Sequence, residues 1–199
     1  MRHSRADVVS RALAVLDRYG LADLTMRRLA SELDVRPSAL YWHVASKQEL
    51  LAAVADELLA RGARPAPPAR TAWDDLVRHH ASVLRDAVLA YRDGAEVVAT
   101  TRAFGMGARQ PFDDLVAALS GGCDPDVAHG AATTLWHFVL GHAGDEQTQL
   151  QAGSAGAVTG VEEPASADGS DVASSATASF DLGVDLIVAG VRARAPTPT

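Results

Sequence analysis

The spacing of apolar residues is helical along almost the whole chain, and this feature limits the possible folds more than any other. Near the N-terminus, Val9, Ala12, Leu13 and Leu16 follow the i, i+3, i+4, i+7 pattern, which places one apolar stripe along a helix that ends at Gly20. No stretch alternates convincingly between apolar and polar residues, as a half-buried strand would. We therefore predict an all-α fold.

Three further helices are predicted before residue 62, and the first two of them are short and closely spaced. One has Thr25 as its N-cap, Asp34 marks a tight turn after it, and the next runs over about residues 38–44. A capping box over residues 46–49 then begins the connecting helix. Two short helices separated by a tight turn are typical of a helix-turn-helix, whose second helix lies in the DNA major groove.

The charge of the chain is divided unevenly. The formal net charge is -7, which by itself argues against a nucleic-acid partner. Residues 1–47, however, hold eight basic and five acidic side chains, whereas residues 48–199 hold ten basic and twenty acidic ones. We interpret the chain as a basic head followed by an acidic body.

Proline and small polar residues indicate where the parts of the chain meet. Residues 64–70 contain three prolines and cannot be helical. Residues 151–178 are rich in Gly, Ser, Ala and Thr and are predicted to form a mobile loop. The predicted domains are a helix-turn-helix head (1–47), a connecting helix (48–62), a Pro-rich linker (63–70) and a ligand-binding and dimerisation body (71–199).

Two predicted helices of the body, at about residues 125–149 and 179–193, are apolar on nearly every face. A helix of this kind has to be covered on every side. We therefore expect both helices to pair with their copies in a four-helix interface of a homodimer.

Several motifs then resemble a known family. They are Leu-Thr-Met-Arg-Arg-Leu-Ala at residues 24–30, Leu-Tyr-Trp-His-Val at 40–44 and Ser-Lys-Gln-Glu-Leu-Leu at 46–51. The head resembles the DNA-binding domain of the TetR family along its full length. Residues 91–95, 101–102, 137–141, 145–147 and 180–187 show a weaker resemblance to the ligand-binding and dimerisation domain of the tetracycline repressor-like subgroup.

The resemblance and the chemistry of the side chains together predict the DNA contacts. The guanidinium fork of Arg27 suits guanine O6 and N7, and the small side chain of Ala39 allows contact with a thymine methyl group. Lys47 is predicted to bind phosphate beside the free N–H groups of the connecting helix. Tyr41, Trp42 and His43 are neighbours on different helical faces, so at least one of them, with Tyr41 or Trp42 favoured, is expected to be partly packed. The predicted contact residues are Thr25, Arg27, Arg36, Pro37, Ser38, Ala39, Tyr41, Trp42, His43 and Lys47.

The resemblance also implies an effector site in the body, with a changed set of residues. Val98 stands where the subgroup has a metal-binding histidine, and Asp145 where a glutamate of the partner subunit approaches the metal. Because valine cannot bind Mg²⁺, we expect an effector other than a magnesium–tetracycline complex, in a more apolar pocket. The predicted effector residues are His80, Leu84, Val98, Thr101, Arg102, Leu115, Leu135, His137, Phe138 and Asp145.

Two of these histidines have a second interpretation. His80 lies in an inward stripe, where a hydrogen-bonded core histidine is the commoner case. His137 lies on a helix face of small residues, which either lets another helix approach closely or leaves a cavity, and the resemblance favours the cavity. Neither a cofactor nor a structural metal is predicted: His142 and Glu146 share a helix face, but two such exposed groups are usually solvated.

The sequence points to a regulator rather than an enzyme. Cys123 has no catalytic motif around it, and no nucleophile elbow or phosphate loop is present. The start of the chain lacks the apolar run of a signal peptide, and no window approaches a membrane span, so a cytoplasmic location without membrane contact is expected.

We therefore predict a homodimeric repressor that binds a palindromic operator of double-stranded DNA and is released by a small-molecule effector. One alternative is a helical enzyme or ligand carrier with a vestigial head. Another is a constitutive regulator whose body serves only dimerisation.

Overall fold

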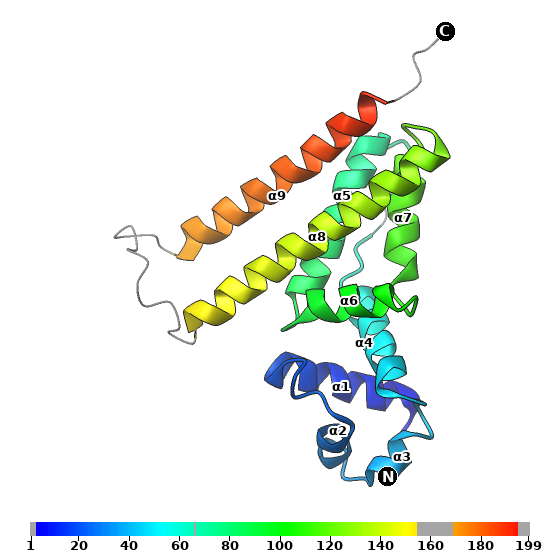
Figure 1. The fold of residues 1–199 in the computed structure, drawn as a ribbon, viewed down its shortest axis with the longest axis vertical. Helices are drawn as coiled ribbons and strands as arrows, with labels where there is room; N and C mark the ends of the chain where they lie inside the picture. Colours follow the sequence, from blue (N-terminus) through cyan, green and yellow to red (C-terminus); the bar gives the residue numbers. More distant parts are fainter. Residues whose placement is uncertain (1–2, 66, 155–168, 195–199) are drawn as a thin grey trace. The chain divides into compact units, whose positions relative to one another are not determined.

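The computed structural model describes residues 3–65, 67–154 and 169–194, and all regular structure within these ranges is helical (Figure 1). The prediction of an all-α fold is confirmed. The helices are α1 (Arg5–Tyr19), α2 (Met26–Glu32), α3 (Pro37–Leu40), α4 (Lys47–Arg61), α5 (Trp73–Leu89), α6 (Gly94–Ala103), α7 (Arg109–Leu119), α8 (Pro125–Ser154) and α9 (Gly169–Arg192).

The chain divides into two compact units. The first unit comprises residues 1–65 and 83–111, and the second comprises residues 66–82 and 112–199. This division differs from the head and body expected from sequence, because α6 packs against α4 and so belongs to the same unit as the helix-turn-helix.

In the first unit, α1 packs against α2 and α4. The apolar stripe predicted between Val9 and Leu16 is buried. A capping box begins α1: Ser4 Oγ accepts the N–H of Asp7 at 3.2 Å, and the Asp7 carboxylate accepts the N–H of Ser4 at 2.8 Å. The helix ends before Gly20, whose φ of +82° lies in the region that favours glycine.

The third and fourth helices differ in detail from the prediction. Helix α3 ends at Leu40, because the Leu40 carbonyl accepts the N–H groups of both His43 and Val44 and closes the helix with a turn. The helix predicted over residues 38–44 is therefore too long. At the start of α4, Ser46 caps as predicted, but the Glu49 carboxylate accepts the N–H of residue 45 at 2.6 Å instead of that of Ser46.

Two aspartates join the surroundings of α6 to α1 and α4 within the first unit. Asp93 Oδ2 accepts the N–H of Leu21 at 2.7 Å, and Asp56 Oδ1 accepts the N–H of Ala108 at 2.7 Å. Asp93 and Ala108 both adopt left-handed backbone conformations, with φ of 55° and 53°. Such a conformation costs a non-glycine residue roughly 1–2 kcal/mol, which these hydrogen bonds help to offset.

Gly62, at the C-terminal end of α4, makes a backbone contact that no larger residue could make. A Cβ atom there would lie 2.3 Å from the Cβ of Ala87 and 2.8 Å from its Cα. We expect Gly62→Ala to lower the free energy of unfolding by about 1–3 kcal/mol, as overpacking does elsewhere. Urea denaturation of both proteins measures the loss. Equal stability would show that α4 and α5 separate freely at this contact.

In the second unit, α8 and α9 lie side by side (Figure 1). Phe138 of α8 stacks on Phe180 of α9 with ring centroids 5.7 Å apart, and the Phe138 ring covers Gly183 so closely that a side chain there would collide with it. The Trp73 ring packs in the same way over Gly122, in the turn between α7 and α8. The contacts of Phe138 hold α9 against α8, and the Trp73 contact holds the start of α5 against the α7–α8 turn.

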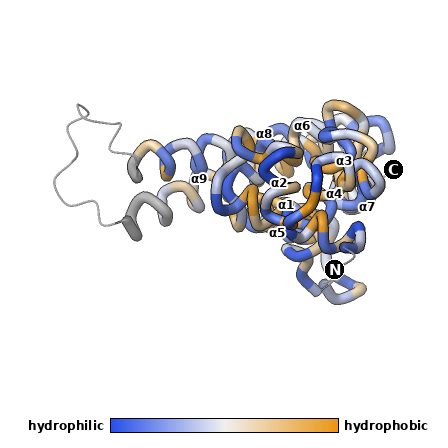
Figure 2. The backbone as a smooth tube through the Cα atoms, turned by 90° about the horizontal axis from the view of Figure 1, so that it is seen from below, coloured by the Kyte–Doolittle hydropathy of each residue, from blue (hydrophilic) through white to orange (hydrophobic). Residues whose placement is uncertain are grey.

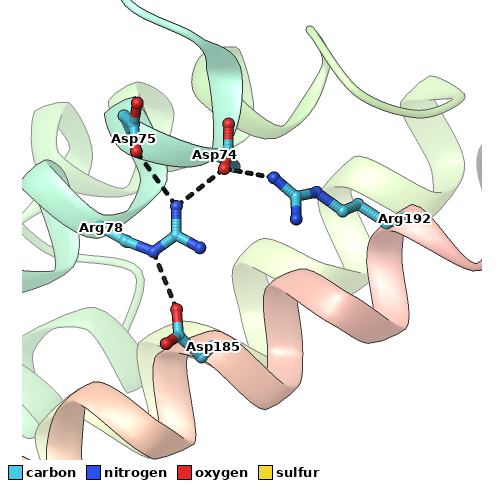
Figure 3. Close-up of polar contacts among 5 residues, drawn as sticks. All are labelled: Asp74, Asp75, Arg78, Asp185 and Arg192. Carbon is cyan, nitrogen blue, oxygen red and sulfur yellow. Dashed lines mark hydrogen bonds and ion pairs between the residues drawn. The ribbon is translucent and has the colours of Figure 1, made fainter.

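A network of ion pairs joins α5 to α9 (Figure 3). Arg78 donates to Asp74 at 2.8 Å and to Asp185 of α9 at 2.8 Å, and it also contacts Asp75 at 3.2 Å. Arg192 of α9 donates to the same Asp74 carboxylate. Asp74 is buried, so a carboxylate with little access to water is held between two guanidinium groups.

This network predicts acid sensitivity. The hydrogen bond from Arg78 lowers the pKa of Asp74, against the opposing effect of burial. Because the folded-state pKa lies below the unfolded one, the network stabilises the fold fully above about pH 5 and loses this contribution as the pH falls through the unfolded and then the folded-state pKa. We expect the free energy of unfolding to fall between pH 5 and pH 3, and to fall less in Asp74→Asn. Denaturation at each pH measures this, with exposed Asp181→Asn as the control. Identical slopes in all three proteins would contradict it.

Helices α8 and α9 are longer than predicted. The loop expected over residues 151–178 is wrong at both ends, because α8 continues to Ser154 and α9 already begins at Gly169. The described part of this segment combines alanine, a strong helix former, with an absence of proline. Residues 155–168, the centre of the expected loop, lie outside the described residues.

Helix α9 is unusually apolar for its exposure. Hydrophobic and hydrophilic residues are interspersed along the helices (Figure 2). Even so, among the described residues Ser174–Arg192 is long and apolar enough to cross a membrane by length and composition, so the expectation that no window approaches a span is wrong. One such helix is weak evidence for a membrane span, because the core helix of a soluble protein passes the same test.

Candidate nucleic-acid interface and effector residues

The turn between α2 and α3 has the geometry that the sequence predicts. Thr25 caps α2, with its Oγ1 accepting the N–H of Arg28 at 3.1 Å. Leu33 ends the helix, and Asp34 follows it with a left-handed φ of 52°. Pro37 then occupies the first turn of α3, where its missing N–H costs nothing.

The residues of α3 and the following turn are divided between a buried anchor and an exposed surface. Leu40 and Val44 are buried, and they hold the segment against the rest of the first unit. Tyr41 is 53% exposed and Trp42 is 89% exposed. At least one of the three side chains at residues 41–43 is partly packed, as expected, but it is the half-buried His43 and neither of the two favoured rings. An almost fully exposed indole ring is costly in water unless a partner covers it.

The two adjacent arginines of α2 have different environments. Arg28 forms an ion pair with Asp23 at 2.9 Å, and its guanidinium lies 4.3 Å from the centre of the Tyr19 ring. Arg27 is exposed and has no ion pair with any side chain in the described part of the chain. Only Arg27 therefore has its whole fork available to a base edge.

The remaining predicted DNA residues lie near the same turn in the sequence. Lys47 is half-buried and is the first residue of α4. Because of this position, its ammonium group adds a positive charge beside the free N–H groups of that helix end. The exposed predicted contacts are Thr25, Arg27, Arg36, Pro37, Ser38, Tyr41 and Trp42, and the half-buried ones are Ala39, His43 and Lys47.

The predicted effector residues belong to both compact units. Those of the first unit are Leu84, Val98, Thr101 and Arg102, and those of the second are His80, Leu115, Leu135, His137, Phe138 and Asp145. The apolar members are buried apart from half-buried Phe138, and the Thr101 hydroxyl is buried and donates within its own helix, to the carbonyl of Val97 at 2.9 Å.

His80 is the polar member of this set with the best-defined environment. It is half-buried, and burial lowers its pKa, an effect that nearby Asp114 opposes and His79 reinforces. The imidazole ring is therefore neutral at pH 7, with one nitrogen that donates and one that accepts a hydrogen bond. Such a group can bind an uncharged polar ligand without the cost of burying a charge.

His137 lies on an outward face of α8 and not in the core of its unit. The same face carries Gly130, Thr134, Gly141 and Asp145, all exposed, and a Cβ atom on either glycine would have no neighbour within 4 Å. Within the second unit this face is open and does not form the cavity that the resemblance favoured. The alternative, close approach of another helix, suits an open face of small residues.

An apolar groove continues this face toward α9. It has a volume of about 550 Å³ and is lined by residues that include Val127, Gly130, Ile187 and Val191. Farther along α9, Leu182 and Leu186 are exposed large apolar side chains. The expectation that α8 is apolar all round is wrong on its outward face, which combines glycines with Thr134, His137 and Asp145.

The described residues offer neither an activated thiol nor a cluster of metal ligands. Burial raises the pKa of Cys123, with nearby Asp124 acting in the same direction, so the thiol is protonated at neutral pH and a weak nucleophile. The described residues contain no group of three or more His, Cys, Asp or Glu side chains that could hold a metal ion.

Two family models match the chain. The model described as "Bacterial regulatory proteins, tetR family" matches residues 8–54, which contain α2, α3 and the start of α4. The model described as "Tetracyclin repressor-like, C-terminal domain" matches residues 64–195.

Individual proteins are similar over nearly the full length. The tetracycline repressor protein class A from transposon 1721 of Escherichia coli is 34% identical over 200 residues, which cover 94% of this chain and 89% of that protein. The crystal structure of Mycobacterium smegmatis BioQ has a TM-score of 0.83 at 38% identity and covers 97% of this chain and 99% of its own. A structure of BioQ with its double-stranded DNA operator has a TM-score of 0.76 at 37% identity, with coverage of 96% and 99%.

Proposed function

Because the chain belongs to the TetR family of bacterial regulatory proteins, it is a DNA-binding transcriptional regulator, and we propose that it acts as a repressor released by a small-molecule effector. The observation that carries this proposal is the exposed surface around the α2–α3 turn. There, Arg27 is exposed without an ion pair among the described residues and Trp42 is 89% exposed, as expected of side chains that meet DNA.

We propose further that the repressor is a homodimer formed through α8 and α9. The open face around Gly141 and the exposed Leu182 and Leu186 support this arrangement, because a second copy would cover all of them. In a twofold dimer, two recognition helices read two half-sites, so the operator would be a palindrome.

Release by an effector requires that the effector favour a conformation with lower operator affinity. We propose that α6 transmits this preference, because α6 packs against α4 and its N-cap residue Asp93 accepts the N–H of Leu21, within the first unit. Neutral His80 would serve as one polar anchor of an apolar effector; the other effector residues remain predictions from the resemblance.

The homologues are transcription regulators and not enzymes, so we propose neither a catalytic activity nor a cofactor for this chain. We propose that it acts in the cytoplasm, as DNA-binding regulators of this family do. The absence of the metal-binding histidine at Val98 further supports an effector other than magnesium–tetracycline.

A two-step experiment tests the proposal. The purified protein first selects duplexes from a randomised library, which should yield a palindromic sequence bound in a strongly salt-dependent manner. A compound panel is then screened for thermal stabilisation and for release of the selected duplex. Failure to enrich any sequence would contradict the DNA-binding function. Sequence-specific binding that no stabilising compound weakens would contradict effector control and leave a constitutive regulator.

A further inference from the structure

The segment before α1 makes a long-range contact with the helix-turn-helix. The Nε2 atom of His3 lies 3.0 Å from the carbonyl oxygen of Leu33, thirty residues away in the sequence, and the contact is partly buried. A carbonyl oxygen can only accept, so the imidazole N–H is the donor.

The acceptor occupies a sensitive position in the DNA-binding motif. Leu33 is the C-cap of α2, and its own N–H donates to the carbonyl of Leu29 at 3.1 Å, so the imidazole satisfies the carbonyl that the end of the helix leaves free. Asp34, with its left-handed backbone, follows directly and redirects the chain toward α3. A group that fixes the Leu33 carbonyl therefore fixes the peptide from which this turn starts.

The donor is itself held in place. Ser4, the next residue, is the N-cap of α1 and forms the capping box with Asp7, with hydrogen bonds of 2.8 to 3.2 Å. His3 therefore extends from a helix end that is ordered by its own hydrogen bonds. Its imidazole links the start of α1 to the end of α2.

The same imidazole forms part of a cavity beside the recognition helix. The cavity has a volume of about 560 Å³ and is lined by His3 and Val8 together with the turn and recognition residues Leu33, Val35, Ala39, Leu40, Trp42 and His43. Three of these, Ala39, Trp42 and His43, are predicted DNA contacts. Helix α3 has four residues, too few to be stable alone, so its orientation depends on such surrounding contacts.

We propose that His3 is a positioning residue for DNA recognition. Its N–H holds the Leu33 carbonyl, and through it the α2–α3 turn, in the orientation that presents α3 to the base edges. The proposal rests on the proposed DNA-binding function and adds to it a residue outside the helix-turn-helix.

The test compares His3→Leu, which keeps an apolar side chain of similar size but removes the donor, with His3→Gln, whose amide N–H can still donate. Affinity is measured by fluorescence anisotropy for the duplex that the wild-type protein selects and for a scrambled duplex of equal length. We expect His3→Leu to weaken binding of the selected duplex by about 3- to 10-fold, the usual effect of one neutral hydrogen bond, and to leave the scrambled duplex unaffected. His3→Gln should restore most of the loss.

His79→Leu, in the second compact unit, is the matched control and should leave both affinities unchanged. The melting temperatures of all variants show whether a loss of affinity for the selected duplex comes from a displaced turn or from unfolding of the protein. Unchanged binding of the selected duplex by His3→Leu would overturn the proposal. An equal loss on both duplexes would do so too, since it would make His3 a phosphate contact, and so would a loss that His3→Gln does not restore. If the wild-type protein selects no sequence, the DNA-binding function itself fails.

Discussion

Gly141→Leu is expected to convert the proposed α8–α9 dimer into a folded monomer. Gly141 lies on the outward face of α8, where an added Cβ would have no neighbour within 4 Å, so the isolated chain has room for the leucine side chain. A glycine within a helix costs about 0.5–1 kcal/mol relative to alanine, and leucine is nearly as good a helix former. The substitution should therefore stabilise the chain by itself. The leucine side chain can weaken association only if a second copy of the chain approaches this face closely.

Sedimentation velocity over a concentration series distinguishes the two states, and circular dichroism shows whether the helices remain. Ala117→Leu provides the matched control, because Ala117 is also exposed on a helix but lies on α7. We expect the control to remain dimeric. A dimeric Gly141→Leu protein with unchanged association would contradict an interface through this face of α8.

The monomer should also lose most of its operator affinity. Two joined heads bind two half-sites with a high effective concentration, which raises overall affinity by about 10²- to 10⁴-fold over a single head. Gly141→Leu should lose a factor of this order on the full palindrome and little on a duplex with one half-site. Equal losses on both duplexes would instead indicate a damaged head.

The sequence predicts the helices well where burial alone determines them. The stripe from Val9 to Leu16 is buried as expected, because an amphipathic helix needs only one apolar face and the spacing of its residues is local information. The left-handed turn at Asp34 was predictable for the same reason, since short polar side chains tolerate that conformation.

The wrong predictions have a common physical origin: they concern segments whose structure depends on tertiary contacts, which the spacing of residues in the sequence does not encode. The start of α9 was predicted as a loop from its small polar residues, although its alanines and the absence of proline allow a helix to extend from the packed part around Phe180. Partial packing of Tyr41 or Trp42 was favoured because residues 41–43 lie on different helical faces, but Leu40 and Val44 are the buried residues of this segment and both rings are exposed.

Of the candidate site, the motif that carries Arg27 and the residues of α3 could be identified from the sequence, and the contact between His3 and Leu33 could not. Arg27 and the residues of α3 form a contiguous motif. His3 lies thirty residues from Leu33, and no periodicity or motif relates the two positions. The effector residues were the least predictable part, because they come from both compact units, and the exposed position of His137 follows from how α8 packs.

Arg27→Ala is expected to weaken binding of the selected operator by about 10- to 100-fold, as the loss of one bidentate contact to guanine does. Arg27 is exposed and has no ion pair among the described residues, so its removal should leave the melting temperature nearly unchanged. Arg27→Lys should recover little of the loss, because an ammonium group cannot make two parallel hydrogen bonds to O6 and N7.

The loss of a positive charge must be distinguished from the loss of a base contact, and Arg11→Ala is the control that does so. Arg11 is also an exposed arginine of the head, and its carboxylate partner, Glu32, is 4.0 Å away in a solvent-exposed pair that contributes little stability. Both alanine variants lose one positive charge and should bind a scrambled duplex equally. Only Arg27→Ala should bind the operator much more weakly and tolerate other bases at one position of each half-site. If the two variants lose the same affinity on the operator, Arg27 acts through its charge, and base reading must come from α3 alone.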